Sequence, residues 1–199
     1  TGVQTCALPI YPEQSEIYLA VADLQRRLKR DDELAKTLAA WKKKFPIDWR
    51  VPYFNTIVAS AAKDYAKALA AFAEAETLGR DAPTEIAPGA PFYFSYGAAH
   101  ERAGDLDQAA GMFRKAIALN PKFANAYNYL GYMWTEKGTN LTEAAELIRK
   151  AVELEPENGA YQDSLGWVLF QLGKPAEALP VLQRAIELLE KETQREPED

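Results

Sequence analysis

The chain has 199 residues, 48% of them hydrophobic and 26% charged, and a formal net charge of -6. This composition is typical of a folded globular chain, and the acidic balance argues against nucleic-acid binding, which depends on clustered Lys and Arg. The single cysteine, Cys6, excludes an internal disulfide, and no stretch reaches the ~18 uninterrupted apolar residues that a membrane span needs, so we expect no membrane insertion.

Residues 1–10, TGVQTCALPI, share neither period nor composition with the rest of the chain. They resemble the translation of a common sequencing adapter, so we expect a non-native segment over 1–10 and a natural chain over 11–199. On this interpretation the true N-terminus is missing, and the lack of a signal peptide says nothing about the compartment. Bacterial cytoplasm and cell envelope both stay open.

Two helical pairs are predicted in the first half of the chain, over 15–48 and 49–89. Apolar residues recur there at the spacing of one helix face. They are Tyr18, Val21, Ala22, Leu34, Leu38 and Trp41 in the first range and Tyr65, Ala68, Phe72 and Ala75 in the second. The basic run Lys42–Lys44 is expected to close a helix, where cations suit the dipole. Residues 77–89 are rich in Pro and Gly and predict an exposed loop.

Three ranges in the second half, 90–123, 124–158 and 159–199, repeat one pattern of large and small residues. Glycine recurs on the first predicted helix of each range and alanine on the second, where larger side chains would push the crossing backbones apart. These glycines are Gly97, Gly131 and Gly166, expected to face Ala109, Ala144 and Ala178. A further set, Gly104, Gly138 and Gly173, falls where the first helix must end in a left-handed residue.

The last predicted helix overruns its siblings by about two turns. Proline occurs inside it, at Pro180, where we expect a local kink. After it, Pro197-Glu198-Asp199 resembles the motif Pro156-Glu157-Asn158 that precedes a new repeat. We therefore expect the chain to be an internal fragment of a longer array.

Matched large and small positions at a period of ~34 residues resemble the tetratricopeptide repeat family. This resemblance implies an all-α fold, a right-handed superhelical solenoid of antiparallel helix hairpins with about five repeats. The run from Leu130 to Leu179 resembles tetratricopeptide proteins of bacteria, many of them exported or attached to the envelope. Members of this family act as scaffolds that bind other proteins, which is the function we expect.

Catalytic chemistry is not indicated by any motif. His100 is the only histidine and occupies a large-residue core position, so we expect a packed, hydrogen-bonded core residue. No nucleophile elbow, phosphate loop, paired CxxC or calcium loop is found. We expect no enzymatic activity, metal or cofactor.

In this family the first helices of successive repeats line a concave groove, and the ligand-facing positions can be carried over to this chain. The predicted partner-binding residues are Tyr53, Phe54, Phe94, Arg102, Asn125, Asn128, Tyr129, Tyr132, Trp167, Phe170 and Gln171. Their aromatic character is typical of a protein-binding surface. An alternative is that several of these side chains pack against the neighbouring helix.

The partner is expected to be a protein or peptide of apolar or extended character. Family members that clamp an acidic tail use Lys, Asn and Arg at positions that here hold Tyr53, Phe94, Asn128 and Asp163, with Ile57, Ala98, Tyr132 and Trp167 one turn on, so no such clamp can form. Two rival functions stay open. One is a substrate-docking region of a larger enzyme, such as a glycosyltransferase or peptidase, with its catalytic domain outside this sequence. The other is a structural arm that associates with itself.

Overall fold

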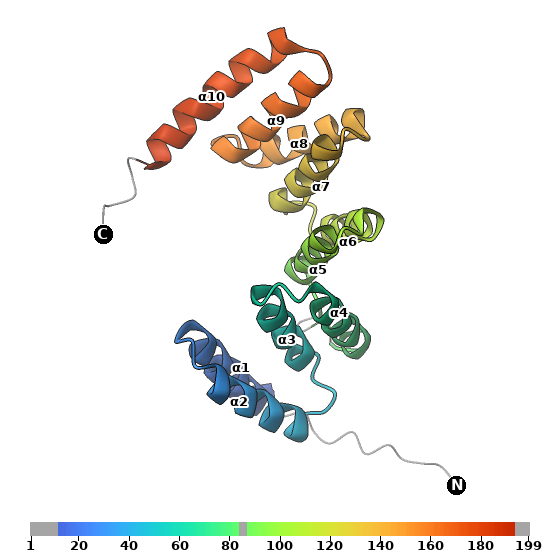
Figure 1. The fold of residues 1–199 in the computed structure, drawn as a ribbon, viewed down its shortest axis with the longest axis vertical. Coiled ribbons are helices and arrows are strands. Elements are labelled where there is room, and N and C mark those ends of the chain that lie inside the picture. Colours follow the sequence, from blue (N-terminus) through green and yellow to red (C-terminus); the bar gives the residue numbers. More distant parts are fainter. Residues whose placement is uncertain (1–11, 84–86, 194–199) are drawn as a thin grey trace. The chain divides into compact units, whose positions relative to one another are not determined.

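The computed structural model describes residues 12–83 and 87–193, and every element in these ranges is an α-helix or a connection between helices (Figure 1). The all-α expectation is therefore confirmed over the described residues. The predicted adapter segment 1–10, residues 84–86 of the predicted loop and the closing motif Pro197–Asp199 lie outside them. In chain order the helices are α1 (Pro12–Arg27), α2 (Asp31–Lys44), α3 (Arg50–Ala61), α4 (Tyr65–Gly79), α5 (Ala90–Ala103), α6 (Leu106–Leu119), α7 (Ala124–Lys137), α8 (Leu141–Leu154), α9 (Gly159–Gln171) and α10 (Pro175–Thr193).

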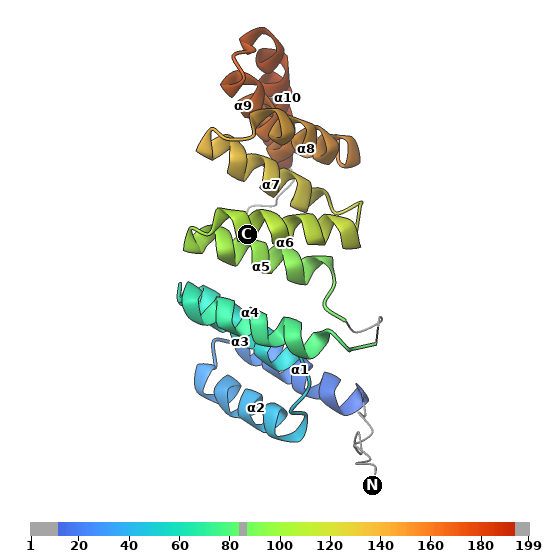
Figure 2. The same ribbon diagram turned by 90° about the vertical axis from the view of Figure 1, so that its right-hand side faces the viewer.

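The chain divides into two compact units, with the boundary between Ala87 and Pro88. Unit 1 contains the hairpins α1–α2 and α3–α4, and unit 2 contains α5–α6, α7–α8 and α9–α10. Within unit 2 the hairpins follow one another, so that α7 packs against both α6 and α8, and α9 packs against both α7 and α8 (Figure 2). The first helices α7 and α9 are therefore neighbours.

One continuous apolar core runs through unit 2. Its largest fully buried side chains include Phe113 on α6, Leu130 on α7 and Ile148 on α8. The glycines on the first helices allow this close approach: a Cβ placed on Gly131 would lie 2.8 Å from the backbone oxygen of Ala144, and one on Gly97 would lie 3.2 Å from that of Ala109. The predicted Gly–Ala pairs are confirmed for these two hairpins.

Gly166 differs, because the three atoms nearest to a Cβ placed there all belong to Leu182 and none to Ala178. The helix ends agree with the sequence. Gly104 and Gly138 are C-caps with φ of 86° and 64°, and Gly173 follows the C-cap Leu172 with φ of 73°. Since these angles are left-handed, glycine is the residue that adopts them without strain.

Unit 1 has its own core, in which Trp41 of α2 is fully buried among Leu34, Leu38, Val51 and Phe54. The basic run Lys42–Lys44 forms the last turn of α2, as predicted. The helix α10 has 19 residues, five more than α6 or α8, and continues through Pro180. The last helix is thus longer than its siblings, as predicted, but over the described residues the extension is five residues, less than the two turns expected.

Candidate functional site

The first helices of unit 2 present one shared row of side chains. On α7, Asn125, Tyr129, Tyr132 and Glu136 are spaced by three or four residues and therefore lie on one side of the helix. The opposite side of α7 carries Leu130, which is fully buried in the core. Matching positions on α5 and α9 extend the row. We call the following set the first-helix face: Phe94, Glu101, Arg102, Asn125, Tyr129, Tyr132, Glu136, Asp163, Trp167, Phe170 and Gln171.

Large aromatic rings are exposed on this face. Tyr129 is 41% exposed, Tyr132 42% and Phe170 54%. Trp167 is half-buried and stacks on Phe170, with ring centroids 5.8 Å apart and an interplanar angle of 17°. Solvated helix faces seldom carry such rings, and a group of exposed aromatic side chains is typical of an interaction surface.

Phe94 links the row from α5 to α7. It is half-buried, and its ring meets that of Tyr129 edge to face at a centroid distance of 4.9 Å. It also contacts Phe123, at 5.4 Å, just before α7 begins. Phe94 therefore packs against the ring of Tyr129 and exposes less of its own side chain to a partner. Arg102 and Gln171, which were predicted together with it, are both exposed.

The two predicted asparagines have different surroundings. Asn125 is exposed, and its Oδ1 accepts a hydrogen bond of 2.6 Å from the hydroxyl of Tyr161 on α9. Burial of that hydroxyl, with Glu155 and Tyr129 adding to the effect, raises the pKa of Tyr161 to about 12. Asn128 is only 9% exposed, and its Oδ1 has no hydrogen-bond partner among the described residues. Asn125 thus lies at the surface, while Asn128 lies beneath it.

Carboxylates flank the aromatic rings between α7 and α9. The indole N–H of Trp167 donates a hydrogen bond of 3.1 Å to Oε1 of Glu136. Burial raises the pKa of Tyr132, and the negative charges of Glu136 and Asp163 raise it further. Both carboxylates therefore lie close enough to the Tyr132 hydroxyl to act on it.

The predicted residues in unit 1 do not form a comparable surface. Phe54 is 3% exposed and belongs to the core around Trp41, so the structure corrects its assignment to the partner-binding set. The Phe54 side chain is buried because α1 and α2 pack against this side of α3. Tyr53 is half-buried, with its ring 5.6 Å from Trp49 and 6.2 Å from Phe72.

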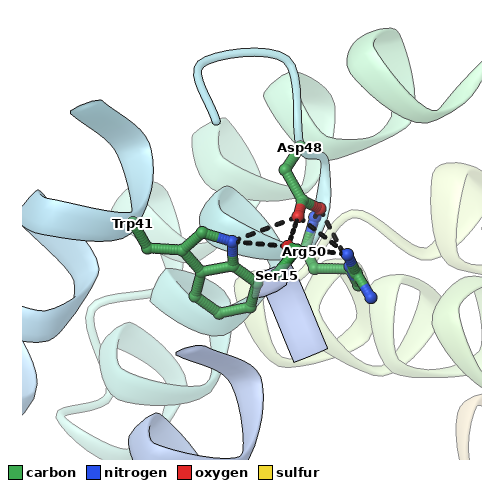
Figure 3. Close-up of polar contacts among 4 residues, drawn as sticks. All are labelled: Ser15, Trp41, Asp48 and Arg50. Carbon is green, nitrogen blue, oxygen red and sulfur yellow. Dashed lines mark hydrogen bonds and ion pairs between the residues drawn. The ribbon is translucent and has the colours of Figure 1, made fainter. Parts of the chain in front are cut away.

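A buried polar cluster in unit 1 was not predicted from the sequence (Figure 3). The hydroxyl of Ser15 donates to Asp48 and accepts from Nε1 of Trp41 at 2.9 Å and from Nη2 of Arg50 at 2.7 Å. Arg50 and Asp48 also form an ion pair of 2.9 Å with side chains only 13% and 9% exposed. One feature of the sequence could have indicated this cluster: Trp41 occupies a position of the repeat that is usually alanine. A tryptophan buried there needs a hydrogen-bond acceptor for its indole N–H.

This cluster connects α1 and α2 to the beginning of α3, so its role is structural. Burial opposes ionisation of Asp48, but hydrogen bonds from Arg50 and Ser15 outweigh it and lower the pKa of Asp48 below its ordinary 3.8.

His100 lies in the core of unit 2, as predicted, stacked on Tyr96 at a centroid distance of 4.8 Å. Its Nδ1 is 3.6 Å from Asp105, beyond hydrogen-bond distance, and has no hydrogen-bond partner among the described residues. Burial lowers the pKa of His100 below 6.5, although Asp105 acts in the opposite direction.

No helix in the part of the chain that the structure describes is both long and apolar enough to cross a membrane.

Comparison with known proteins finds the same repeat. The family model described as tetratricopeptide repeat matches residues 97–151 and 136–192. A search of curated protein sequences finds no match. Solved structures do match: MamA, at 22% identity with a TM-score of 0.74, covering 94% of this chain and 97% of that one, and MamA 41-end from Desulfovibrio magneticus RS-1, at 21% and 0.76, covering 92% and 97%.

A third structure is YrrB, described as a TPR protein with an unusual peptide-binding site. It matches at 17% identity with a TM-score of 0.71 and covers 86% of this chain and 84% of its own. At such identities these structures establish the fold, and the family model establishes the repeat over unit 2. Residues 97–192 therefore belong to the tetratricopeptide repeat family, and the solved structures show that the chain has the fold of tetratricopeptide-repeat proteins.

Proposed function

We propose that the chain is a protein-interaction scaffold whose first-helix face binds an extended segment of a partner protein. The observation that carries this proposal is the exposure of Tyr129, Tyr132 and Phe170 on neighbouring first helices of one unit. Aromatic rings supply much of the binding energy at protein interfaces, and here they are surrounded by the polar residues Asn125, Glu136, Asp163 and Gln171.

An extended segment suits the dimensions of the face. The exposed aromatic side chains lie on the neighbouring first helices α7 and α9, and helix axes in contact are about 8–10 Å apart. A peptide in extended conformation spans that distance in about three residues, so alternate side chains can reach rings on different helices. The peptide-binding site named for YrrB, a protein of the same fold, is consistent with this mode of binding.

The test begins with peptides selected from a random-sequence display library on the immobilised protein. Their affinities are then measured by fluorescence anisotropy on the wild type and on the double variant Tyr129→Ala/Phe170→Ala. Truncating each anchor ring should weaken binding about 30-fold, and truncating both about 1,000-fold if the effects add, since hot-spot side chains contribute about 2 kcal/mol or more each.

The matched control is Leu119→Ala/Leu179→Ala, which truncates two exposed apolar side chains on the second helices α6 and α10. It should bind the peptides like the wild type. Circular dichroism checks that both double variants keep their helices. If the selected peptides bind Tyr129→Ala/Phe170→Ala as tightly as the wild type, the first-helix face is not the binding surface.

A further inference from the structure

The first-helix face contains a cluster of two carboxylates and two aromatic rings between α7 and α9. Tyr132 and Glu136 come from α7, Asp163 and Trp167 from α9, and the two helices pack side by side. We propose that this cluster, the acid–aromatic site, binds a Lys or Arg side chain of the partner segment. The inference rests on the proposed function and names the chemistry of the partner.

The orientation of Trp167 is fixed from two sides. Its indole N–H donates to Glu136 at 3.1 Å, and its ring stacks on Phe170 at 5.8 Å. The first contact joins α9 to α7 and the second follows the helix surface. Because one edge of the ring is hydrogen-bonded and one face is stacked, Trp167 offers its other face as a preorganised aromatic surface next to a carboxylate. Glu136 accepts one hydrogen bond here, and a carboxylate can accept about four.

The carboxylates of Glu136 and Asp163 both act on the hydroxyl of Tyr132. Besides burial, both Glu136 and Asp163 raise the pKa of the Tyr132 phenol, so their negative potentials overlap at that hydroxyl. Their charges add to the attraction that aromatic faces already exert on a cation.

Within the part of the chain that the structure describes, neither carboxylate has a basic partner: no Lys or Arg lies within ion-pair distance of Glu136 or Asp163. Two acidic residues on the second helix α8, by contrast, have basic partners: Glu143 pairs with Arg114 at 3.0 Å and Glu153 with Lys150 at 2.9 Å. The acid–aromatic site therefore has an uncompensated negative charge that a bound cation would balance.

Apolar and acidic side chains of a partner fit the acid–aromatic site less well than basic ones. An apolar side chain laid over this cluster would remove water from Glu136 and Asp163 without replacing their hydrogen bonds, which is costly for ionised groups. An acidic side chain would be repelled by both. A guanidinium can stack on Trp167 and donate to the carboxylates together, so Arg should be preferred to Lys.

The test uses the display-selected peptides described above. We expect Lys or Arg to be enriched at a fixed position, and replacement of that residue by norleucine for Lys, or by neutral citrulline for Arg, to weaken binding about tenfold. In the variant Glu136→Gln/Asp163→Asn the charged and neutral peptides should bind with similar affinity. Raised salt should weaken the charged peptide alone.

The matched control is Glu153→Gln on α8, which removes one charge away from the face and should preserve the preference for a basic residue. Two failures can be told apart. Peptides that lose affinity on Tyr129→Ala/Phe170→Ala but tolerate the neutral replacement would overturn the acid–aromatic site and leave the face standing. Peptides insensitive to Tyr129→Ala/Phe170→Ala would overturn the proposed function itself.

Discussion

Replacing Gly131 by alanine should destabilise unit 2 through a steric conflict between α7 and α8. A Cβ on Gly131 would lie 2.6 Å from Cγ1 of Ile148 and 2.8 Å from the backbone oxygen of Ala144. The Ile148 side chain is fully buried and cannot move aside freely, and the oxygen belongs to α8 itself. The added methyl therefore has to push the two helices apart.

The magnitude follows from two opposing contributions. Alanine in place of glycine within a helix gains about 1 kcal/mol, while overpacking a well-packed core costs about 1–3 kcal/mol. Gly111 on α6 separates them, because a Cβ there has no described atom within 4 Å. We expect Gly111→Ala to stabilise unit 2, and the difference between the two variants to equal the steric cost of about 1–3 kcal/mol.

Urea unfolding provides the measurement. Hairpins of a repeat array can unfold in more than one step, so helix content from circular dichroism is followed together with tryptophan fluorescence. Trp134 and Trp167 of unit 2 contribute to this signal along with Trp41 and Trp49 of unit 1. The comparison is between the urea midpoints of Gly131→Ala and Gly111→Ala. Equal stability of the two variants would show that α7 and α8 do not approach as closely as described, and would refute the reasoning.

Three further predictions concern polar contacts. Asp48→Asn leaves the largely buried Arg50 without its counter-charge and should destabilise unit 1 by about 3–5 kcal/mol at neutral pH. Because the pKa of Asp48 is lowered, the stability that this residue contributes in the wild type is present above pH 3.8 and is lost as the pH falls below that value. If the urea midpoint of Asp48→Asn falls with acid as steeply as that of the wild type, this prediction is contradicted. Since burial lowers the pKa of His100, the folded state should lose stability as the pH falls below 6.5, and His100→Gln should flatten that dependence in thermal unfolding; an unchanged slope would point to another group. Tyr161→Phe and Asn125→Ala should show a coupling free energy of about 1 kcal/mol in a double-mutant cycle of urea unfolding, whereas additive effects would mean that their hydrogen bond contributes nothing.

Local chemistry explains why so much of the hairpin architecture could be predicted. Gly104 and Gly138 end their helices because only a residue without Cβ adopts their positive φ easily, and this preference is visible in the sequence alone. The same holds for Gly131, whose alignment with Ala144 follows from the repeat period. The aromatic row was predicted from the ligand-facing positions of the resembled family, and Tyr129 and Tyr132 are exposed on α7.

Which side chains are buried, and which side chains contact one another, depends on the neighbouring helices. The sequence did not reveal these features. Phe54 and Tyr129 were both assigned to a ligand-facing surface, yet Phe54 is covered by α1 and α2 while Tyr129 is 41% exposed. The ion pair of Asp48 with Arg50 gains its third member, Ser15, from a helix more than thirty residues earlier.

The acid–aromatic site has the same origin. Glu136 and Trp167 are 31 residues apart and meet only because α7 and α9 pack side by side. Repeat spacing thus determined the helices, their ends and which side chains share a face, since these depend on residues within a turn or a hairpin. The tertiary structure decided which of those side chains are covered and which charges stay unpaired, because both depend on packing between hairpins.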